Sequence, residues 1–183
     1  MKVLIIGFGS IGKRHFSIIK NNLKFAKIFI LSRRNLNIRG AKVNKNINEI
    51  KNIKFNYIII ANETSQHYST LKYLEKNFKN TKILIEKPLF HKYINLKSKN
   101  KIFIGYNLRF HPGVILFKKL IKNQSIFNIK VIANSYLPNW RKNDYSQSYS
   151  ANSKKGGGVI LDLSHEIDLA MWIFGNIKIV NCY

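Results

Sequence analysis

The sequence Gly7-Phe8-Gly9-Ser10-Ile11-Gly12, near the amino terminus, constrains the fold more than any other feature. It follows the apolar run Val3–Ile6 and precedes Ile11–Phe25, whose hydrophobic residues have helical spacing. Between a strand and a helix, this glycine pattern allows a tight turn, a close approach of a pyrophosphate and close helix–strand packing. The unpaired N–H groups at the start of the helix would then face the phosphates. The motif therefore predicts a dinucleotide-binding unit.

Further apolar runs alternate with helix-length segments in the first half of the chain. They are continuous rather than alternating, which is typical of strands buried on both faces of a parallel sheet. The predicted strands are Val3–Ile6, Lys27–Leu31, Tyr57–Ala61, Lys82–Ile85 and Lys101–Gly105, with a second helix over Ser65–Phe78. The polar segment Arg34–Phe55 indicates no clear element. We therefore expect an α/β Rossmann domain over residues 1–108.

The pattern changes after about Leu108, and residues 109–183 are expected to form a second domain. Here the sequence predicts helices over Val114–Ile121 and Val159–Phe174, strands over Ile126–Tyr136 and Ile177–Tyr183, and a long polar loop over Pro138–Lys155. The helix predicted over Val159–Phe174 follows three consecutive glycines and stops at Gly175.

The net charge of +24 has two interpretations. A basic protein neutralises phosphates, which suggests nucleic acid. However, lysine supplies 26 of the 32 positive charges, and these lysines are scattered, as A/T-rich codon usage would also produce. No nucleic-acid motif is present, so we expect no specific nucleic-acid partner. No apolar run approaches the ~20 residues that span a bilayer, and Met1 is not followed by a signal sequence, so a cytoplasmic protein with no membrane partner is expected.

The end of the second strand usually contacts the adenosine ribose of the cofactor. A carboxylate there binds the 2′-hydroxyl of NAD. This chain instead has Ser32-Arg33-Arg34, with no acidic residue nearby. A hydroxyl and two guanidinium groups can hold a phosphate, so the sequence favours NADP over NAD. The alternative is that both arginines belong to the general basic surface.

Two other groups of residues carry chemistry. Glu86-Lys87-Pro88 follows a strand whose carboxyl end would lie where such sheets place ligands, although a surface ion pair is the simpler interpretation. Asp162 and His165 are three residues apart, so they should share a helical face, with Asp168 one turn further on. Histidine beside aspartate can act as a general base, but a structural His–Asp pair is equally compatible. The single cysteine, Cys182, excludes a multi-cysteine metal cluster, and no metal is expected.

Taken together, the motifs resemble those of the Gfo/Idh/MocA oxidoreductases over nearly the whole chain. Their order and context are specific: Gly7–Gly12, Ile58–His67, Glu86-Lys87-Pro88, Gly105–Pro112, and Gly156-Gly157-Gly158 followed by Asp162, His165 and Asp168. The resemblance implies a Rossmann domain, a second α/β domain that forms the substrate pocket and often an oligomer interface, and hydride transfer between a nicotinamide cofactor and a sugar or polyol hydroxyl.

The same resemblance implies roles for particular residues. Lys87 would polarise the reacting oxygen, His165 would exchange its proton, and Asp162 would assist. The expected cofactor contacts are Gly7, Phe8, Gly9, Ser10, Ile11, Gly12, Ser32, Arg33, Arg34, Asn62, Glu63, His67, Glu86 and Lys87. Arg109, Trp140 and Tyr149 would contact the substrate, although the two aromatic residues could equally be core residues. The segment Tyr136–Tyr149, which contains Trp140 and Tyr145, resembles a branch of this family that is linked to surface-polysaccharide sugar pathways.

Three departures from the family pattern qualify these expectations. Many relatives separate the aspartate and the histidine by four positions rather than three. The stretch from Pro88 to Gly105 is short, which suggests a reduced helix. Family members are also close to twice this length, so we expect an incomplete second domain. The alternative functions are a cofactor-binding pseudoenzyme or regulator, and an inactive fragment.

Overall fold

The computed structural model describes residues 1–140, 144–147, 149–176 and 178, with the backbone alone at 137, 140, 147, 149 and 154. The chain divides into two compact units. The first comprises Met1–Gly105 together with Lys154–Gly156, and the second comprises Tyr106–Ser153 and Gly157–Tyr183. The sequence-based division after residue 108 lies close to the point where the chain leaves the first unit.

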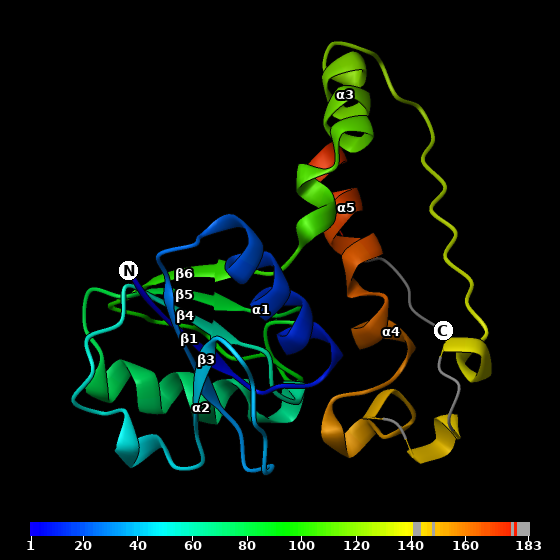
Figure 1. Ribbon diagram of the computed structural model, residues 1–183. Coiled ribbons are helices and arrows are strands. Elements are labelled where there is room, and N and C mark those ends of the chain that lie inside the picture. Colours follow the sequence, from blue (N-terminus) through cyan, green and yellow to red (C-terminus); the bar gives the residue numbers. More distant parts are fainter. Residues whose placement is uncertain (141–143, 148, 177, 179–183) are drawn as a thin grey trace. The chain divides into compact units, whose positions relative to one another are not determined.

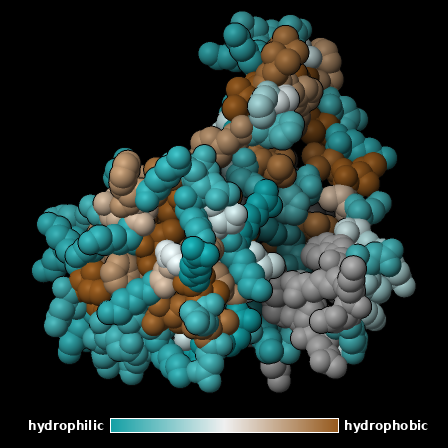
Figure 2. Space-filling model, in the orientation of Figure 1, coloured by the Kyte–Doolittle hydropathy of each residue, from teal (hydrophilic) through white to brown (hydrophobic). Residues whose placement is uncertain are grey.

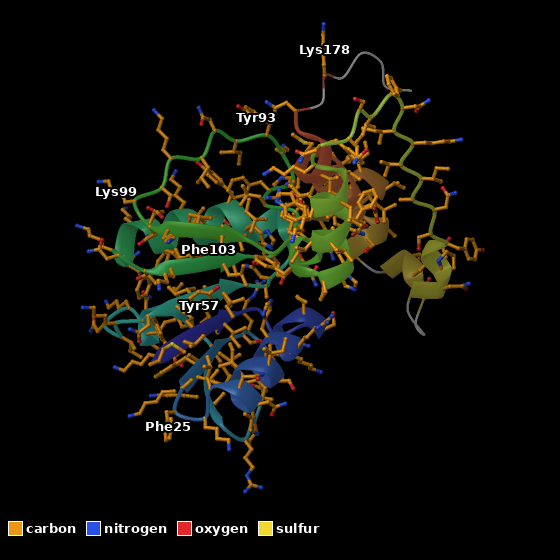
Figure 3. The ribbon with its side chains drawn as sticks, turned by 90° about the horizontal axis from the view of Figure 1, so that it is seen from above. Phe25, Tyr57, Tyr93, Lys99, Phe103 and Lys178 are labelled. Atoms are coloured by element: carbon orange, nitrogen blue, oxygen red, sulfur yellow. The ribbon has the colours of Figure 1, made fainter. Side chains whose placement is uncertain are left out.

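The first unit is built on a six-stranded parallel sheet (Figure 1). Its strands are β1 (Lys2–Ile6), β2 (Lys27–Leu31), β3 (Ala41–Asn44), β4 (Tyr57–Ile60), β5 (Lys82–Ile85) and β6 (Lys101–Ile104). Their spatial order is β3-β2-β1-β4-β5-β6, the doubly wound order of dinucleotide-binding domains. Figure 3 labels Tyr57 on β4 and Phe103 on the edge strand β6. The predicted Rossmann fold is therefore confirmed.

The two long helices of this unit cover opposite faces of the sheet (Figure 1). Helix α1 (Ser10–Asn22) packs through Ile11, Phe16 and Ile19 against one face, and helix α2 (Thr64–Asn77) packs through Leu71 and Leu74 against the other. Side chains alternate along the central strands, so Leu4 and Ile6 belong to the α2 face while Val3 and Ile5 belong to the α1 face. Burial on both faces explains the continuous apolar runs in the sequence.

The connection from β5 to β6 contains no helix, although such crossovers usually carry one. Instead, Phe90 packs into the core on the α2 face. Asn100, which is buried, accepts a hydrogen bond from the Thr81 amide (3.0 Å) and donates to the Phe78 carbonyl (2.9 Å) and to Glu75 of α2 (3.0 Å). A polar clamp therefore holds the start of β6 against α2.

The second unit is helical in the part of the chain that the structure describes. It contains α3 (Pro112–Ile121), α4 (Val159–Asp162) and α5 (Ser164–Phe174). Short 3-10 turns accompany them at η2 (Asn107–Phe110), η3 (Leu137–Trp140), η4 (Tyr145–Gln147) and η5 (Tyr149–Ala151). A further turn, η6 (Ser153–Lys155), passes from the second unit into the first, which also has η1 (Ile47–Glu49). The described part of the loop predicted after Pro138 therefore consists largely of 3-10 turns.

Two predictions about the second unit were wrong. Residues 126–136 form no strand, because a strand needs a partner and this segment pairs with none among the described residues. The helix predicted over Val159–Phe174 is broken at Leu163, whose backbone leaves the helical region (φ −97°, ψ 17°). The strand predicted over Ile177–Tyr183 lies almost entirely outside the described residues.

Many apolar side chains of the second unit are exposed. Leu116 and Leu120 on α3 are more than half exposed, and Figure 2 shows hydrophobic residues on the surface of this helix. A polar contact joins two of these helices, because Lys118 of α3 donates a hydrogen bond to the carbonyl of Trp172 in α5 and lies over its ring.

Candidate cofactor site

The glycine-rich loop joins β1 to α1 at the point where the strand order of the sheet reverses. Gly7 has a left-handed backbone (φ +90°), and a Cβ at this position would lie 2.6 Å from the Ala61 carbonyl oxygen after β4. A Cβ on Gly12 would lie 2.2 Å from the Gly7 carbonyl oxygen. Only glycine fits either position, so the close packing expected from the motif is present.

Gly9 differs from these two glycines because open space surrounds it. A Cβ there would meet no atom within 4 Å. Gly9 also precedes the amino end of α1, which has no side-chain cap and no acidic residue in its first turn. Open space beside uncapped N–H groups is the environment that a pyrophosphate requires. The loop therefore fits a dinucleotide, with Phe8, Ser10 and Ile11 completing it.

Ser32, Arg33 and Arg34 follow β2 and lie beside the same loop. The Ser32 amide donates to the Asn44 carbonyl (3.0 Å), and the Arg34 amide donates to the Ser32 hydroxyl (3.3 Å). The Arg34 guanidinium donates to the carbonyl of Phe8, so this side chain contacts the glycine-rich loop directly. Arg33 is exposed. No carboxylate occurs between Ser32 and Gly40.

Asn62 and Glu63 form the loop between β4 and α2. The Asn62 amide nitrogen donates to the Thr70 hydroxyl (2.9 Å), whereas Oδ1 is buried with no hydrogen-bond partner in the described structure. A buried polar atom without a partner is unusual and fits a site that a ligand completes. Glu63 is exposed at the amino end of α2.

His67 lies in the first turns of α2 and is only 1% exposed. Its Nδ1 is 3.1 Å from the carbonyl oxygens of both Pro88 and Leu89, and its Nε2 is 3.2 Å from the Asn62 carbonyl oxygen. Burial lowers the pKa of His67, although the three carbonyl groups act in the opposite direction. The ring is therefore enclosed by backbone and joins the loops after β4 and β5.

Glu86-Lys87-Pro88 follows β5, and the Glu86 amide continues the sheet by donating to the Ile60 carbonyl (3.0 Å). Nε2 of His15, on α1, lies 2.6 Å from Oε1 of Glu86. A Cβ on Gly105 would lie 3.0 Å from Oε2 of the same carboxylate. Lys87 is half-buried, and its peptide bond to Pro88 is cis. The carboxyl ends of β1, β2, β4 and β5 thus bring the expected cofactor residues to one edge of the sheet.

Asp162 and His165 lie in the second unit, on different helices. Asp162 ends α4 and is buried, and the Ser150 hydroxyl lies 3.4 Å from its Oδ1. His165 belongs to α5, where Nε2 is 3.3 Å from Glu166 Oε1 and Nδ1 is buried without a hydrogen-bond partner in the described structure. The expectation that both residues share a continuous helical face was therefore wrong, because the helix breaks at Leu163.

Asp168 pairs with Arg109 instead of extending the Asp162–His165 group. Arg109 donates from Nε to Asp168 Oδ2 (2.8 Å) and from Nη2 to Oδ1. The hydrogen bond with Asp168 raises the pKa of Arg109. The guanidinium also lies 6.0 Å from the ring centres of Tyr106 and Trp172. The side chains of Trp140 and Tyr149, the other expected substrate contacts, lie outside the described part of the structure.

His15 and Gly105 were not predicted from the sequence to lie beside Glu86. His15 follows Gly12 by three residues, so it lies almost one helical turn further along α1. This spacing from a glycine of the cofactor motif was the sequence signal that could have identified His15 as a residue of the site. Gly105 carried no signal of this role, because its partner is distant in the sequence.

No group of three or more metal-binding side chains is found among the described residues. Likewise, none of the described helices is both long and apolar enough to cross a membrane.

Comparisons with known proteins agree with this geometry. The Rossmann fold resembles several sugar-related dehydrogenases at low sequence identity. One is the WlbA (WbpB) dehydrogenase of Thermus thermophilus, solved with NAD and UDP-GlcNAcA (TM-score 0.72, 18% identity, 96% of this chain and 63% of that chain). Another is the WlbA dehydrogenase of Bordetella pertussis, solved with NADH and UDP-GlcNAcA (TM-score 0.74, 16% identity, 95% and 58%). A myo-inositol dehydrogenase of Corynebacterium glutamicum is also similar (TM-score 0.62, 20% identity, 94% and 54%).

This chain spans less than two thirds of the length of these structures. A comparison of the sequence with curated proteins finds no match. Two family models do match, one described as the NAD-binding Rossmann fold of an oxidoreductase family over residues 1–112 and one as its C-terminal alpha/beta domain over residues 118–182. Because these matches extend over both units, the chain belongs to the Gfo/Idh/MocA family of oxidoreductases.

Proposed function

We propose that the protein binds a nicotinamide dinucleotide and transfers a hydride between the nicotinamide and a hydroxyl or keto group of a sugar derivative. The open space at Gly9, beside the uncapped amino end of α1, carries the proposal. A sugar-type substrate is supported by the similar fold of dehydrogenases solved with UDP-GlcNAcA. The nicotinamide supplies the hydride chemistry. The protein binds and orients the cofactor and the substrate, and its side chains move the proton.

Three residues are proposed to act at the reacting centre. Lys87 follows β5 at the cofactor edge of the sheet, where an ammonium group would polarise the substrate oxygen. His165 would exchange the hydroxyl proton, and its buried Nδ1 without a hydrogen-bond partner in the described structure leaves a ring nitrogen available. Asp162, buried at the end of α4, would assist as a second polar group.

We further propose that the cofactor is NADP. Arg33 and Arg34 follow β2, where the 2′ position of the adenosine ribose is bound in this fold, and no carboxylate is present there to repel a phosphate. Arg33 is exposed, and the Ser32 hydroxyl lies beside Arg34. The similar structures hold NAD or NADH, so the two cofactors need a direct comparison.

The experiment compares the affinities of NADPH and NADH by fluorescence titration. The wild-type protein should bind NADPH more tightly. Arg33→Ala should weaken the binding of NADPH by about tenfold, which corresponds to about 1.4 kcal/mol for one charged contact to phosphate. The affinity for NADH should stay nearly unchanged. Arg39→Ala is the matched control, because Arg39 is an exposed arginine in the same segment. Tighter binding of NADH would contradict the NADP assignment.

A turnover assay tests the reaction itself. The protein with NADP⁺ or NADPH is incubated with nucleotide sugars, free sugars and their keto forms, and absorbance at the nicotinamide band is followed. Lys87→Ala and His165→Ala should each abolish any turnover that the wild type shows, and in His165→Ala the affinity for the cofactor should persist. Tight cofactor binding with no turnover over the whole panel would instead favour a cofactor-binding regulator.

A further inference from the structure

The chain segment that carries Lys87 has little regular structure of its own. Glu86 makes the last sheet hydrogen bond of β5, and no helix follows before β6. In an unsupported segment, backbone and side chain would sample many conformations. Lys87 nevertheless needs a defined position if it is to polarise a substrate oxygen. Phe90 anchors the connection in the core three residues after Lys87, and contacts from other residues must fix the chain nearer to Lys87.

On the amino side of Lys87, the Glu86 side chain is fixed from α1. His15 Nε2 and Glu86 Oε1 are 2.6 Å apart, and the exposed fractions of the two side chains are 19% and 15%. Because carboxylates only accept hydrogen bonds, Nε2 carries the donated proton. Gly105 leaves space for this carboxylate, since a Cβ there would approach Oε2 to 3.0 Å.

On the carboxyl side of Lys87, the backbone is fixed from α2. Nδ1 of His67 is within 3.1 Å of the carbonyl oxygens of both Pro88 and Leu89. Its Nε2 is 3.2 Å from the carbonyl oxygen of Asn62, which belongs to the loop before α2. Full burial of the ring limits it to these backbone partners and keeps it away from solvent.

We propose that His15 and His67 are positioning residues that hold the Lys87 segment from its two sides, a role that rests on the proposed hydride transfer. Each histidine belongs to a helix that begins at one of the cofactor loops, α1 after Gly7–Gly9 and α2 after Asn62–Glu63. The position of Lys87 is thus tied to the same two loops that would hold the dinucleotide. Small displacements at a reacting centre reduce rates strongly, by about a hundredfold per ångström.

Conservative variants separate this role from simple core packing. The amide nitrogen of asparagine lies near the position of histidine Nδ1, and that of glutamine lies near the position of Nε2. The amide of His67→Asn can therefore donate to Pro88 and Leu89, whereas the amide of His67→Gln can donate only to Asn62. In the same way, His15→Gln keeps the donor to Glu86, and His15→Leu removes it. His111→Gln, at an exposed position of the second unit, is the control.

The rate at which an amine-reactive reagent modifies Lys87 is measured by mass spectrometry, in the full chain with and without NADPH. We expect His15→Leu and His67→Gln to change this rate by about threefold or more. His15→Gln, His67→Asn and the control should stay within about twofold of the wild type. Thermal unfolding identifies variants that do not fold. If His15→Leu is unfolded, His15→Asn replaces it, because its amide nitrogen lies near the position of Nδ1 and cannot donate to Glu86.

Equal Lys87 modification rates in folded His67→Asn and His67→Gln proteins would overturn the role of His67. A rate unchanged in His15→Leu, or changed equally in His15→Gln and His15→Leu, would overturn that of His15. Where turnover is measurable, kcat should fall in the same variants with little change in the affinity for NADPH. Absence of NADPH binding in the wild type would contradict the proposed function alone, because the modification rate in the free protein still tests the positioning.

Discussion

The glycines of the Gly7–Gly12 loop have different physical roles, although they belong to one motif. Gly7 and Gly12 are required by the protein itself, because added Cβ atoms would collide with backbone oxygens at 2.6 Å and 2.2 Å. Gly9 has no such constraint: its surroundings are open and its backbone (φ −75°, ψ −161°) suits any residue. Under the proposed function, the pyrophosphate rather than the fold requires glycine at this position.

Substitutions at Gly9 and Gly12 should separate stability from cofactor binding. Gly9→Val should leave the unfolding midpoint nearly unchanged and weaken NADPH binding by at least about tenfold, because the added methyl groups occupy the phosphate position. Gly12→Ala should lower the free energy of unfolding by about 1–3 kcal/mol, because the backbone must shift. Denaturant unfolding and calorimetric titration measure the two effects. Unchanged NADPH affinity in Gly9→Val would contradict the placement of the pyrophosphate.

His67 should make the stability of the protein depend on pH. Because burial lowers its pKa below the ordinary value of 6.5, the unfolded chain takes up a proton before the native protein does as the pH falls. Stability should therefore be full above pH 6.5 and decrease below it, by at most about 1.4 kcal/mol per pH unit. The carboxylates with lowered pKa, Glu49 and Glu75, respond only below 4.5.

Urea unfolding at about pH 7.5 and pH 5.5 tests this expectation. The loss of stability between the two conditions should be smaller in His67→Asn than in the wild type, since asparagine does not titrate. His111→Asn, at an exposed histidine, should behave like the wild type. Equal losses in the wild type and His67→Asn would show that the buried imidazole does not contribute.

Among the secondary-structure elements, those with continuous apolar runs were predictable from the sequence. Burial on both faces gave β1, β2, β4 and β5 a clear signature, and helical spacing identified α1 and α2. Strand β3 (Ala41–Asn44) was missed because it is short and only its last residue is buried, so its sequence lacks an apolar run. Segment 126–136 has the alternation of a strand, but pairing depends on a partner that local sequence does not contain.

For the candidate site too, features set by local sequence were predictable, whereas contacts between residues distant in sequence were not. The placement of its glycines, Lys87 and the Ser32–Arg34 group directly after strands was predictable from motifs, and parallel strands end at one edge of the sheet. The contacts of Glu86 with His15 and of Asp168 with Arg109 join residues distant in sequence. The break at Leu163 was equally hidden, since leucine is a good helix former.

At the β5–β6 connection, the polar clamp replaces a covering helix, and Asn100 is its centre. Burial raises the pKa of Glu75, but hydrogen bonds from Ser98, Lys99 and Asn100 outweigh it and lower the pKa. Removal of the Asn100 amide leaves the Thr81 N–H and the Phe78 carbonyl without these partners. The clamp should therefore contribute measurably to stability.

Asn100→Ala should lower the free energy of unfolding by about 1–3 kcal/mol, the cost of a buried polar group without a hydrogen bond. Asn52→Ala is the matched control, because Asn52 is exposed in a turn of the same unit. Denaturant unfolding gives the free energy of unfolding of both variants. Equal values would mean that water forms hydrogen bonds with the Thr81 N–H and the Phe78 carbonyl in place of Asn100.

At the scale of the whole molecule, the charge of +24 does not identify a partner. The lysines are spread along both units, as Lys99 and Lys178 illustrate in Figure 3. Within this charge, Arg33, Arg34 and Lys87 have specific proposed roles. The two units also differ in character: the first has a buried core on both faces of its sheet, whereas the second exposes much of its apolar surface.

A cofactor that binds only the native protein should stabilise it by mass action. NADPH at a hundred times its dissociation constant should raise the free energy of unfolding by about 2.7 kcal/mol. The shift in the unfolding midpoint with NADPH concentration measures this directly. The same concentrations of adenosine, which lacks the pyrophosphate, serve as the control and should give a much smaller shift.

The proposed function requires that the loop Gly7–Gly12 holds the pyrophosphate of a nicotinamide dinucleotide. Titration of ¹⁵N-labelled protein with NADPH, followed by NMR of the backbone amides, tests this placement. The amide signals of Gly7, Gly9, Ser10 and Ile11 should shift and saturate together, with those of Arg33 and Asn62. Saturation without movement of the Gly7–Gly12 signals, or no saturable shift at all, would contradict the claim.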